Sequence, residues 1–214
     1  MNADVRTVAT TTHGRYLVTM PGVTPVGLLV GFHGYAEDAD THLAALRTIP
    51  GTERWIIVAV QALHPFYTRD QRVVANWMTR QDRDLAIADN LAYVRRVVDE
   101  VTTAHGRSGP LVFAGFSQGG AMAYRAAVDG TAAGVIILAA DVPPEIWARA
   151  VLQLPPVLLG RGTSDPWYTE EKHAADLAAL QLRGVDVESC VFDGGHEWAP
   201  AFRDAASHFV ARFG

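Results

Sequence analysis

The sequence contains a serine in a setting that favours nucleophilic chemistry. Ser117 stands in the motif Gly115-Phe116-Ser117-Gln118-Gly119, which follows a short apolar run and leads into a segment of helical periodicity. A G-x-S-x-G motif between a strand and a helix is typical of a sharp turn that lifts the serine hydroxyl above the end of a sheet. Glycines on both sides permit the strained backbone and the close approach that this turn requires. Ser117 is therefore predicted to be a nucleophile.

A serine hydroxyl is a weak nucleophile that needs a base, and the base needs a carboxylate to orient it. His196 follows the last apolar run of the chain, and Asp165 follows the run before it. Parallel strands end at one edge of a sheet, so Ser117, Asp165 and His196 are expected to lie together there. They also follow the order Ser, Asp, His that accompanies this serine turn. Asp141 and Asp193 are the alternative carboxylates.

The same chemistry requires two N–H donors for the negative oxygen of a tetrahedral intermediate. One is expected to be the backbone N–H of Gln118, directly after the nucleophile. The second is predicted to be the backbone N–H of Tyr35, because Phe32-His33-Gly34-Tyr35 closes the first predicted parallel strand and resembles the His-Gly motif of esterases. His33 is then a structural member of that loop. A metal-binding role for it is weaker, since no histidine spacing here matches a zinc site.

The elements that must position these residues alternate between short apolar runs and longer segments of helical period. This alternation predicts an α/β protein with a mostly parallel central sheet and helices on both faces. The predicted parallel strands are residues 27–32, 55–60, 111–114, 135–139, 157–159 and 187–192. The predicted helices are residues 41–47, 84–103, 118–128, 144–152, 170–182 and 200–213.

The sequence also allows predictions for two further segments. Residues 5–12 and 15–19 flank His13-Gly14, which predicts that the chain opens with an antiparallel hairpin. Residues 61–83 form the longest segment without a strong period, and a loop of that length is more often functional than idle.

Composition limits the class of protein. The chain has 214 residues, of which 49% are hydrophobic and 19% charged, so we expect one domain over residues 1–214 without a separate cap domain and exclude a disordered chain or a coiled coil. The formal net charge is −5 and the arginines form no basic run, which argues against nucleic-acid binding. No membrane span is predicted. The single cysteine, Cys190, and the absence of a signal-like start favour a cytoplasmic location.

Aromatic residues lie near the predicted ends of the strands. They either line an apolar pocket for the acid part of a substrate or fill the core. The candidates are Phe66, Tyr67, Trp77, Trp167, Tyr168 and Trp198. Among them, Trp77, Trp167 and Phe66 are the predicted substrate-binding residues.

The sequence resembles the phospholipase/carboxylesterase family of α/β hydrolases, which includes acyl-protein thioesterases and small bacterial carboxylesterases. The motifs that carry the resemblance are Gly31-Phe32-His33-Gly34-Tyr35-Ala36-Glu37-Asp38, Asn76-Trp77-Met78, Gly115-Phe116-Ser117-Gln118-Gly119-Gly120-Ala121, Gly162-Thr163-Ser164-Asp165-Pro166 and Gly194-Gly195-His196. The resemblance implies the α/β-hydrolase fold, the triad Ser117, Asp165 and His196, and oxyanion donors at Tyr35 and Gln118. It also implies hydrolysis of esters or thioesters without a cofactor or metal.

Three short stretches depart from the usual pattern of that family. Asn76-Trp77-Met78 stands where members usually carry Ser-Trp-Phe, Arg161-Gly162 where His-Gly is usual, and Ala139-Ala140 where Ser-Gly is usual. None of them includes a residue of the predicted triad. The first lies in the loop expected to border the acyl site, so it bears on the class of substrate.

The sequence therefore predicts a serine carboxylesterase that acts on a small-molecule ester, with short to medium acyl chains, as a monomer or homodimer. An acyl-thioesterase or a lysophospholipase with the same triad is the alternative within the enzymes. A non-catalytic binding module is the alternative outside them, because a fold alone does not establish activity.

Overall fold

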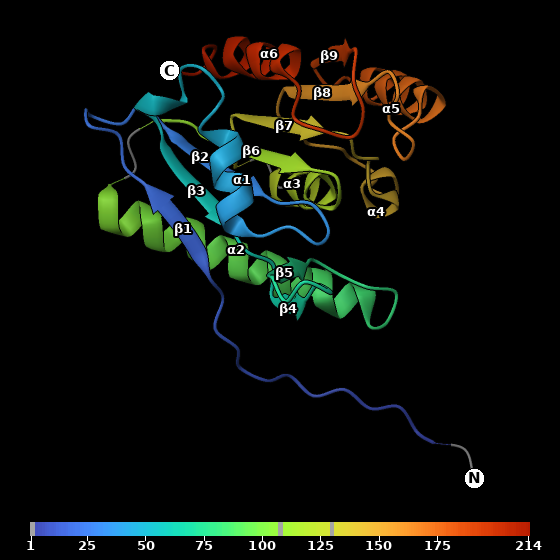
Figure 1. The fold of residues 1–214 in the computed structure, drawn as a ribbon. Helices are drawn as coiled ribbons and strands as arrows, with labels where there is room; N and C mark the ends of the chain where they lie inside the picture. Colours follow the sequence, from blue (N-terminus) through green and yellow to red (C-terminus); the bar gives the residue numbers. More distant parts are fainter. Residues whose placement is uncertain (1–2, 107–108, 129–130) are drawn as a thin grey trace.

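A seven-stranded sheet in the order β1-β3-β2-β6-β7-β8-β9 forms the centre of the part of the chain described by the computed structural model, residues 3–106, 109–128 and 131–214 (Figure 1). All neighbouring strands are parallel except β1 and β3, which are antiparallel. The strands are β1 (Tyr16–Thr19), β2 (Leu28–Phe32), β3 (Ile56–Val60), β6 (Leu111–Phe116), β7 (Gly134–Leu138), β8 (Val157–Gly162) and β9 (Val187–Phe192). The predicted mostly parallel sheet is confirmed.

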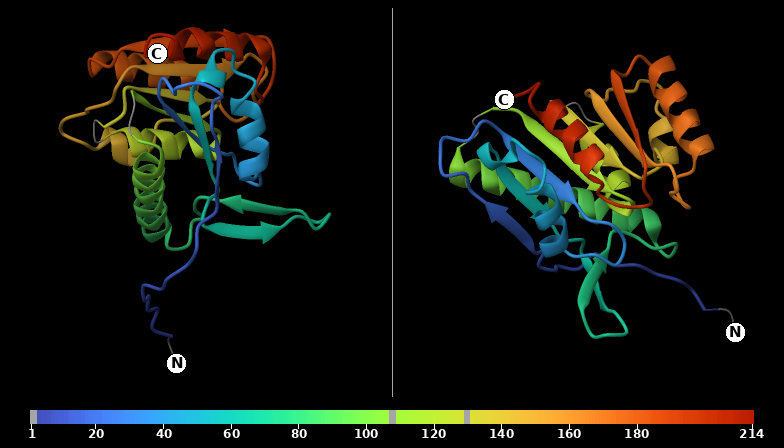
Figure 2. Two further views of the ribbon diagram at one scale, coloured as in Figure 1. Left: turned by 90° about the vertical axis from the view of Figure 1, so that its left-hand side faces the viewer. Right: turned by 45° about the horizontal axis from the view of Figure 1, so that its top comes forward.

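Helices cover both faces of this sheet (Figures 1 and 2). They are α1 (Ala39–Leu46), α2 (Arg83–His105), α3 (Gln118–Ala127), α4 (Pro144–Trp147), α5 (Glu170–Leu182) and α6 (Pro200–Val210), with a 3-10 turn η1 (Thr52–Arg54). α1 packs directly over Gly31 of β2, and α6 packs over Gly160 of β8 on the same face. α2, α3 and α5 lie on the opposite face. In the described residues, no helix is long and apolar enough to cross a membrane.

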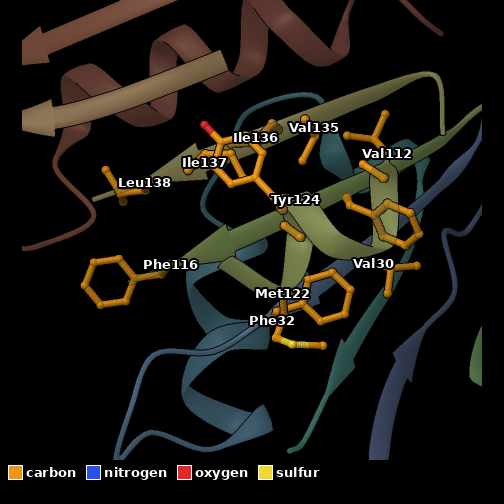
Figure 3. Packing of buried hydrophobic residues seen from close by; sticks show 14 of the residues in the cluster. Val30, Phe32, Val112, Phe116, Met122, Tyr124, Val135, Ile136, Ile137 and Leu138 are labelled. Carbon is orange, nitrogen blue, oxygen red and sulfur yellow. The ribbon is translucent and has the colours of Figure 1, made fainter. Parts of the chain in front are cut away.

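The core lies on both sides of the central strands, where the apolar runs of the sequence are buried (Figure 3). Ile136 and Ile137 point to opposite faces of β7 and are both completely buried. A parallel strand with helices on both sides has no solvent-facing row, so its sequence is continuously apolar rather than alternating. The short apolar runs were therefore reliable signals for these strands.

The predicted opening hairpin is wrong. Only Tyr16–Thr19 forms a strand, and it pairs with β3 rather than with residues 5–12. The segment before it runs away from the sheet (Figure 2), and Val5 and Val8 are exposed. A two-stranded hairpin needs an apolar face to pack against something, and a segment with these two valines among polar residues buries too little area for that.

A hairpin that the sequence analysis missed lies inside the segment predicted to be a loop. β4 (His64–Tyr67) pairs with β5 (Val73–Asn76) in an antiparallel register that places Phe66 opposite Val74. It projects from the body of the molecule (Figure 2). Its strands are only four residues long and mix polar with apolar residues, so no clear period marks them. α4 also ends at Trp147, short of the predicted 144–152.

A fully buried histidine, His42, lies between α1 and the sheet. Its imidazole lies 5.9 Å from the ring of Trp198. Burial, with a smaller contribution from the charge of nearby His33, lowers the pKa of His42 from 6.5 to about 3. His42 is therefore neutral in the folded protein at neutral pH.

This burial predicts that acid destabilises the fold through His42. Between pH 6.5 and pH 3 the unfolded chain binds a proton at this residue that the folded chain does not. The free energy of unfolding should then fall with decreasing pH by up to about 1.4 kcal/mol per pH unit from this residue alone. Urea unfolding of wild type and His42→Leu at neutral pH and at about pH 4.5 tests it, because the loss on acidification should be smaller in the variant. Equal losses would contradict the expectation.

Candidate active site

Ser117 lies at the carboxyl end of β6 in a strained backbone conformation. Its φ and ψ are 53° and −122°, immediately before the first turn of α3. Its N–H donates to the carbonyl of Leu138 over 2.9 Å, which ties the turn to the neighbouring strand. A side chain at Gly115 would overlap with the carbonyl of Gly119, and one at Gly119 would overlap with the carbonyl of Phe32. The two glycines are therefore required by the close approach of β2, β6 and α3.

His196 and Asp165 are in direct contact at the same edge of the sheet. The distance from His196 Nδ1 to Asp165 Oδ2 is 2.8 Å. The other oxygen of Asp165 accepts the backbone N–H groups of Trp167 and Tyr168, both over 2.9 Å. In the tautomer that donates Nδ1–H to the buried carboxylate of Asp165, the lone pair of His196 Nε2 is the acceptor of the ring.

The two alternative carboxylates are engaged elsewhere. Asp141 forms an ion pair with Lys172, with 3.2 Å between Oδ2 and Nζ. Asp193 accepts a hydrogen bond from the Thr163 hydroxyl over 3.4 Å. Of the three candidates, Asp165 is therefore the one that contacts His196.

Ser117 and His196 line the same cleft, which has a volume of about 350 Å³. The His196 ring lies between two aromatic rings, with centroids 4.8 Å from Phe116 and 4.8 Å from Trp167. In this conformation no hydrogen bond joins the described atoms of Ser117 and His196. In ligand-free hydrolases this contact is often long and shortens only when substrate binds. Ser117 and His196 therefore face the same cleft, and Asp165 contacts His196 from outside its lining.

The loop that carries Tyr35 is fixed by the side chain of Glu37. Glu37 Oε2 accepts the backbone N–H of Gly34 over 2.7 Å, and the N–H of Glu37 donates back to the Gly34 carbonyl over 3.3 Å. Between them, Ala36 has a positive φ of 59° and donates its N–H to Ala75 of β5. Burial raises the pKa of Glu37. We call the two hydrogen bonds between Gly34 and Glu37 the Glu37 clamp. Among the described residues, the Tyr35 N–H takes no part in the hydrogen bonds of this loop.

Gln118 joins this side of the site to the segment after the hairpin. Its side-chain oxygen accepts the backbone N–H of Trp77 over 2.9 Å, and its side-chain nitrogen donates to the carbonyl of Met78 over 3.0 Å. Its own backbone N–H is in the first turn of α3, where no intrahelical partner exists. Tyr35 and Gln118 thus offer backbone N–H groups from neighbouring strand ends.

The prediction that Trp77 binds substrate is not supported by its position. Trp77 is completely buried, its Nε1–H donates to the carbonyl of His33 over 2.8 Å, and its ring packs against Phe32. The buried indole packs against the loop that follows β2, and Trp77 is not among the residues that line the cleft. Trp167 is exposed and lines the cleft, whereas Phe66 packs on the ring of Tyr35 at 5.6 Å, on the hairpin side.

His33 is placed as a structural member of its loop. Its Nε2 accepts the N–H of Ala62 over 3.1 Å, so Nδ1 carries the proton and donates to the Gly34 carbonyl over 2.7 Å. Burial lowers the pKa of His33, in agreement with a neutral ring. Within the described residues, no three histidine, cysteine or acidic side chains gather into a set that could hold a metal ion.

Two groups of residues were missed by the sequence analysis. One is the Glu37 clamp, whose acidic residue carries no signal in the sequence beyond its place in the motif after β2. The other is a set of basic side chains, Arg83, Arg125 and Lys172, on the wall of the cleft. Lys172 is the only lysine of the chain, which was the one available signal.

The clamp predicts that Glu37→Ala lowers kcat for ester hydrolysis by about ten- to a hundred-fold, somewhat less than the loss of a whole oxyanion donor. KM should change little, because the clamp touches the loop and not the ester itself. Glu37→Gln keeps an oxygen that accepts the Gly34 N–H and should retain most of the activity. Steady-state kinetics of both variants test this, and wild-type kcat in Glu37→Ala would contradict it.

The chain matches a known protein family over most of its length. The model of the family described as Phospholipase/Carboxylesterase matches residues 15–212. Similar solved structures include esterase PE8, which is 23% identical with a TM-score of 0.72 over 93% of this chain and 97% of that chain. No curated protein sequence matches the chain significantly.

Two further structures have the same fold. The Bacillus cereus carboxylesterase is 15% identical, with a TM-score of 0.73 over 93% of this chain and 94% of that one. The Zea mays acyl-protein thioesterase 2 is 18% identical, with a TM-score of 0.71 over 94% of this chain and 99% of that one. The fold and the site together define an α/β hydrolase. Within that class, the chain belongs to the phospholipase/carboxylesterase family.

Proposed function

We propose that this protein is a serine carboxylesterase that hydrolyses small carboxylic esters with short to medium acyl chains. The observation that carries the proposal is the contact of His196 Nδ1 with Asp165 Oδ2 at 2.8 Å beside a cleft that Ser117 also lines. The cleft volume of about 350 Å³ suits a small ester.

In the proposed reaction, Nε2 of His196 takes the proton of the Ser117 hydroxyl while Oγ attacks the ester carbonyl. The negative oxygen of the tetrahedral intermediate accepts hydrogen bonds from the backbone N–H groups of Tyr35 and Gln118. The intermediate collapses, the alcohol leaves with the proton from His196, and an acyl-enzyme remains. Water, deprotonated by the same histidine, then attacks the acyl-enzyme and releases the acid. Asp165 stabilises the imidazolium in both steps.

A thioesterase or a lysophospholipase uses the same chemistry on another leaving group. The similarity of fold to an acyl-protein thioesterase favours the first of these as the second candidate. A series of nitrophenyl esters from acetate to laurate, run beside matching thioesters, separates the candidates. Higher kcat/KM for the short oxoesters supports the carboxylesterase, and a preference for long thioesters would replace it.

Covalent labelling tests whether the site is catalytic at all. A fluorophosphonate probe should add one phosphonyl group to Ser117 with loss of fluoride, located by mass spectrometry of the digested protein. Ser117→Ala should not be labelled. The absence of an adduct in the wild type would favour a non-catalytic binding module instead. The cytoplasmic location, the single domain and the monomeric or homodimeric state stay predictions from the sequence.

A further inference from the structure

Basic side chains from three separate helices converge on the cleft beside Ser117. Arg83 stands at the start of α2, Arg125 on α3 and Lys172 in the first turn of α5, and all three line the cleft. The side chain of Arg125 is buried, with 4% exposed, whereas those of Arg83 and Lys172 are 37% and 49% exposed. Two of the three cations are therefore accessible to a molecule that enters the cleft.

The two arginines share one carboxylate, that of Glu145, whose side chain is 40% exposed. Glu145 Oε1 accepts from Arg125 Nε over 2.6 Å, and Glu145 Oε2 accepts from Arg83 Nη2 over 3.2 Å. Glu145 thus pairs with both guanidinium groups, and Asp141, which also lines the cleft, pairs with Lys172. Arg83 also contacts Asp84, but the Asp84 side chain is 95% exposed, so water and salt screen that charge strongly.

Lys172, which also lines the cleft, has spare hydrogen-bonding capacity. Its ammonium donates to the Trp167 carbonyl over 2.8 Å and to Asp141 Oδ2 over 3.2 Å. An ammonium has three N–H groups, so one remains for a ligand. The ion pair with Asp141 is half exposed, and such pairs are weak enough to exchange partners.

We propose that this cleft selects ester substrates that carry a negatively charged group, a carboxylate or a phosphate, held by Lys172 and Arg83. The proposal rests on the proposed function and names the substrate class for the same site. A long apolar chain placed there would remove the water around Arg83 and Lys172 without replacing its hydrogen bonds, which is unfavourable. An anionic group instead gains charge-assisted hydrogen bonds from the exposed parts of Arg83 and Lys172.

The test compares matched esters that differ only in charge. The nitrophenyl monoester of adipic acid presents a carboxylate on the acid side, and its neutral partner carries an isopropyl group in place of that carboxylate. Acetyl esters of hydroxyphenylacetate and of hydroxyphenylacetamide form the corresponding pair on the leaving-group side. Spontaneous hydrolysis is subtracted for each compound. In at least one pair, kcat/KM should favour the anionic ester about ten-fold or more, the size expected for a charged hydrogen bond.

Variants then assign the preference to the cleft. Lys172→Met and Arg83→Met should each lower the ratio of kcat/KM between the charged and the neutral ester, and Lys172→Arg should retain it. Arg47→Met removes an exposed arginine at the end of α1 and should leave the ratio at its wild-type value. Because the readout is a ratio within each variant, a general loss of activity does not mimic the effect.

The outcomes separate this proposal from the proposed function. If the neutral esters are hydrolysed and Ser117 is labelled, yet neither pair shows a preference for the anion, the substrate class is wrong and the esterase assignment remains. A preference that survives in both methionine variants would also overturn it. If no ester is hydrolysed, both proposals are overturned together. A preference that weakens with added salt is expected, because part of the attraction is long-range.

Discussion

Replacing Ser117 by alanine is expected to lower the turnover of a nitrophenyl ester by about a million-fold. The expectation follows from the site, where Ser117 is the hydroxyl held by the strained turn at the edge of the cleft that His196 also lines. Without Oγ no acyl-enzyme forms, and His196 and Asp165 have nothing to activate except water. The residual rate then comes from binding and from the oxyanion donors alone.

Ser189 provides a matched control for this measurement. Its hydroxyl lies 3.1 Å from Nε2 of His173, so the chain contains a second serine–histidine contact, between β9 and α5. Neither of these residues lines the cleft. Ser189→Ala should therefore retain turnover within about two-fold, as a surface-like change outside the site does. Steady-state rates of both variants test this expectation, and thermal melts check that both are folded. Near-wild-type turnover in Ser117→Ala would contradict the assignment of Ser117 as the nucleophile.

Asp165→Asn is expected to lower turnover by roughly ten-thousand-fold with the fold intact. The two backbone N–H groups of Trp167 and Tyr168 bind one oxygen of Asp165, and they would bind the amide oxygen of asparagine in its place. The amide nitrogen would then face His196 Nδ1. Two donors cannot face each other, so Nδ1 would lose its proton and Nε2 would carry one. In that tautomer, His196 cannot accept the serine proton.

The measurement for Asp165→Asn is kcat/KM for the same ester, with Asp193→Asn as the control. Asp193 lies in the same loop as His196 and contacts only the Thr163 hydroxyl among the described hydrogen bonds, so its amide variant should behave like wild type. If Asp141→Asn or Asp193→Asn were the damaging change and Asp165→Asn harmless, the choice of carboxylate would be wrong.

The elements and residues set by local pattern were predictable from the sequence. The central strands β2, β3 and β7 are continuous apolar runs because both of their faces are buried, and they were placed within one residue at each end, as was the partly exposed edge strand β9. Ser117, Asp165 and His196 could be proposed as the triad because the chain order and the strand ends are visible in the sequence. The contact of His196 with Asp165 follows from that arrangement.

The parts that depend on contacts between distant segments were not predictable. Trp77 was assigned to the substrate pocket, whereas its buried contacts with His33 and Gln118 decide its position. The hairpin of β4 and β5 is hydrogen-bonded to the loop of Glu37 through Ala75. No local periodicity in the sequence predicts this contact. The basic wall of the cleft likewise comes from three helices that are far apart in the chain. Such features arise from tertiary packing and need coordinates to be recognised.

For enzyme engineering, the site contains two kinds of position. A side chain at residue 119 would push α3 away from β2, and one at residue 115 would push α3 away from β6, so a mutant library randomised at either position would consist mostly of proteins that fail to assemble the turn. Residues 83 and 172 line the cleft without belonging to that turn. Under the proposed substrate preference, directed evolution at these two positions should change which esters are accepted while the reacting groups keep their places.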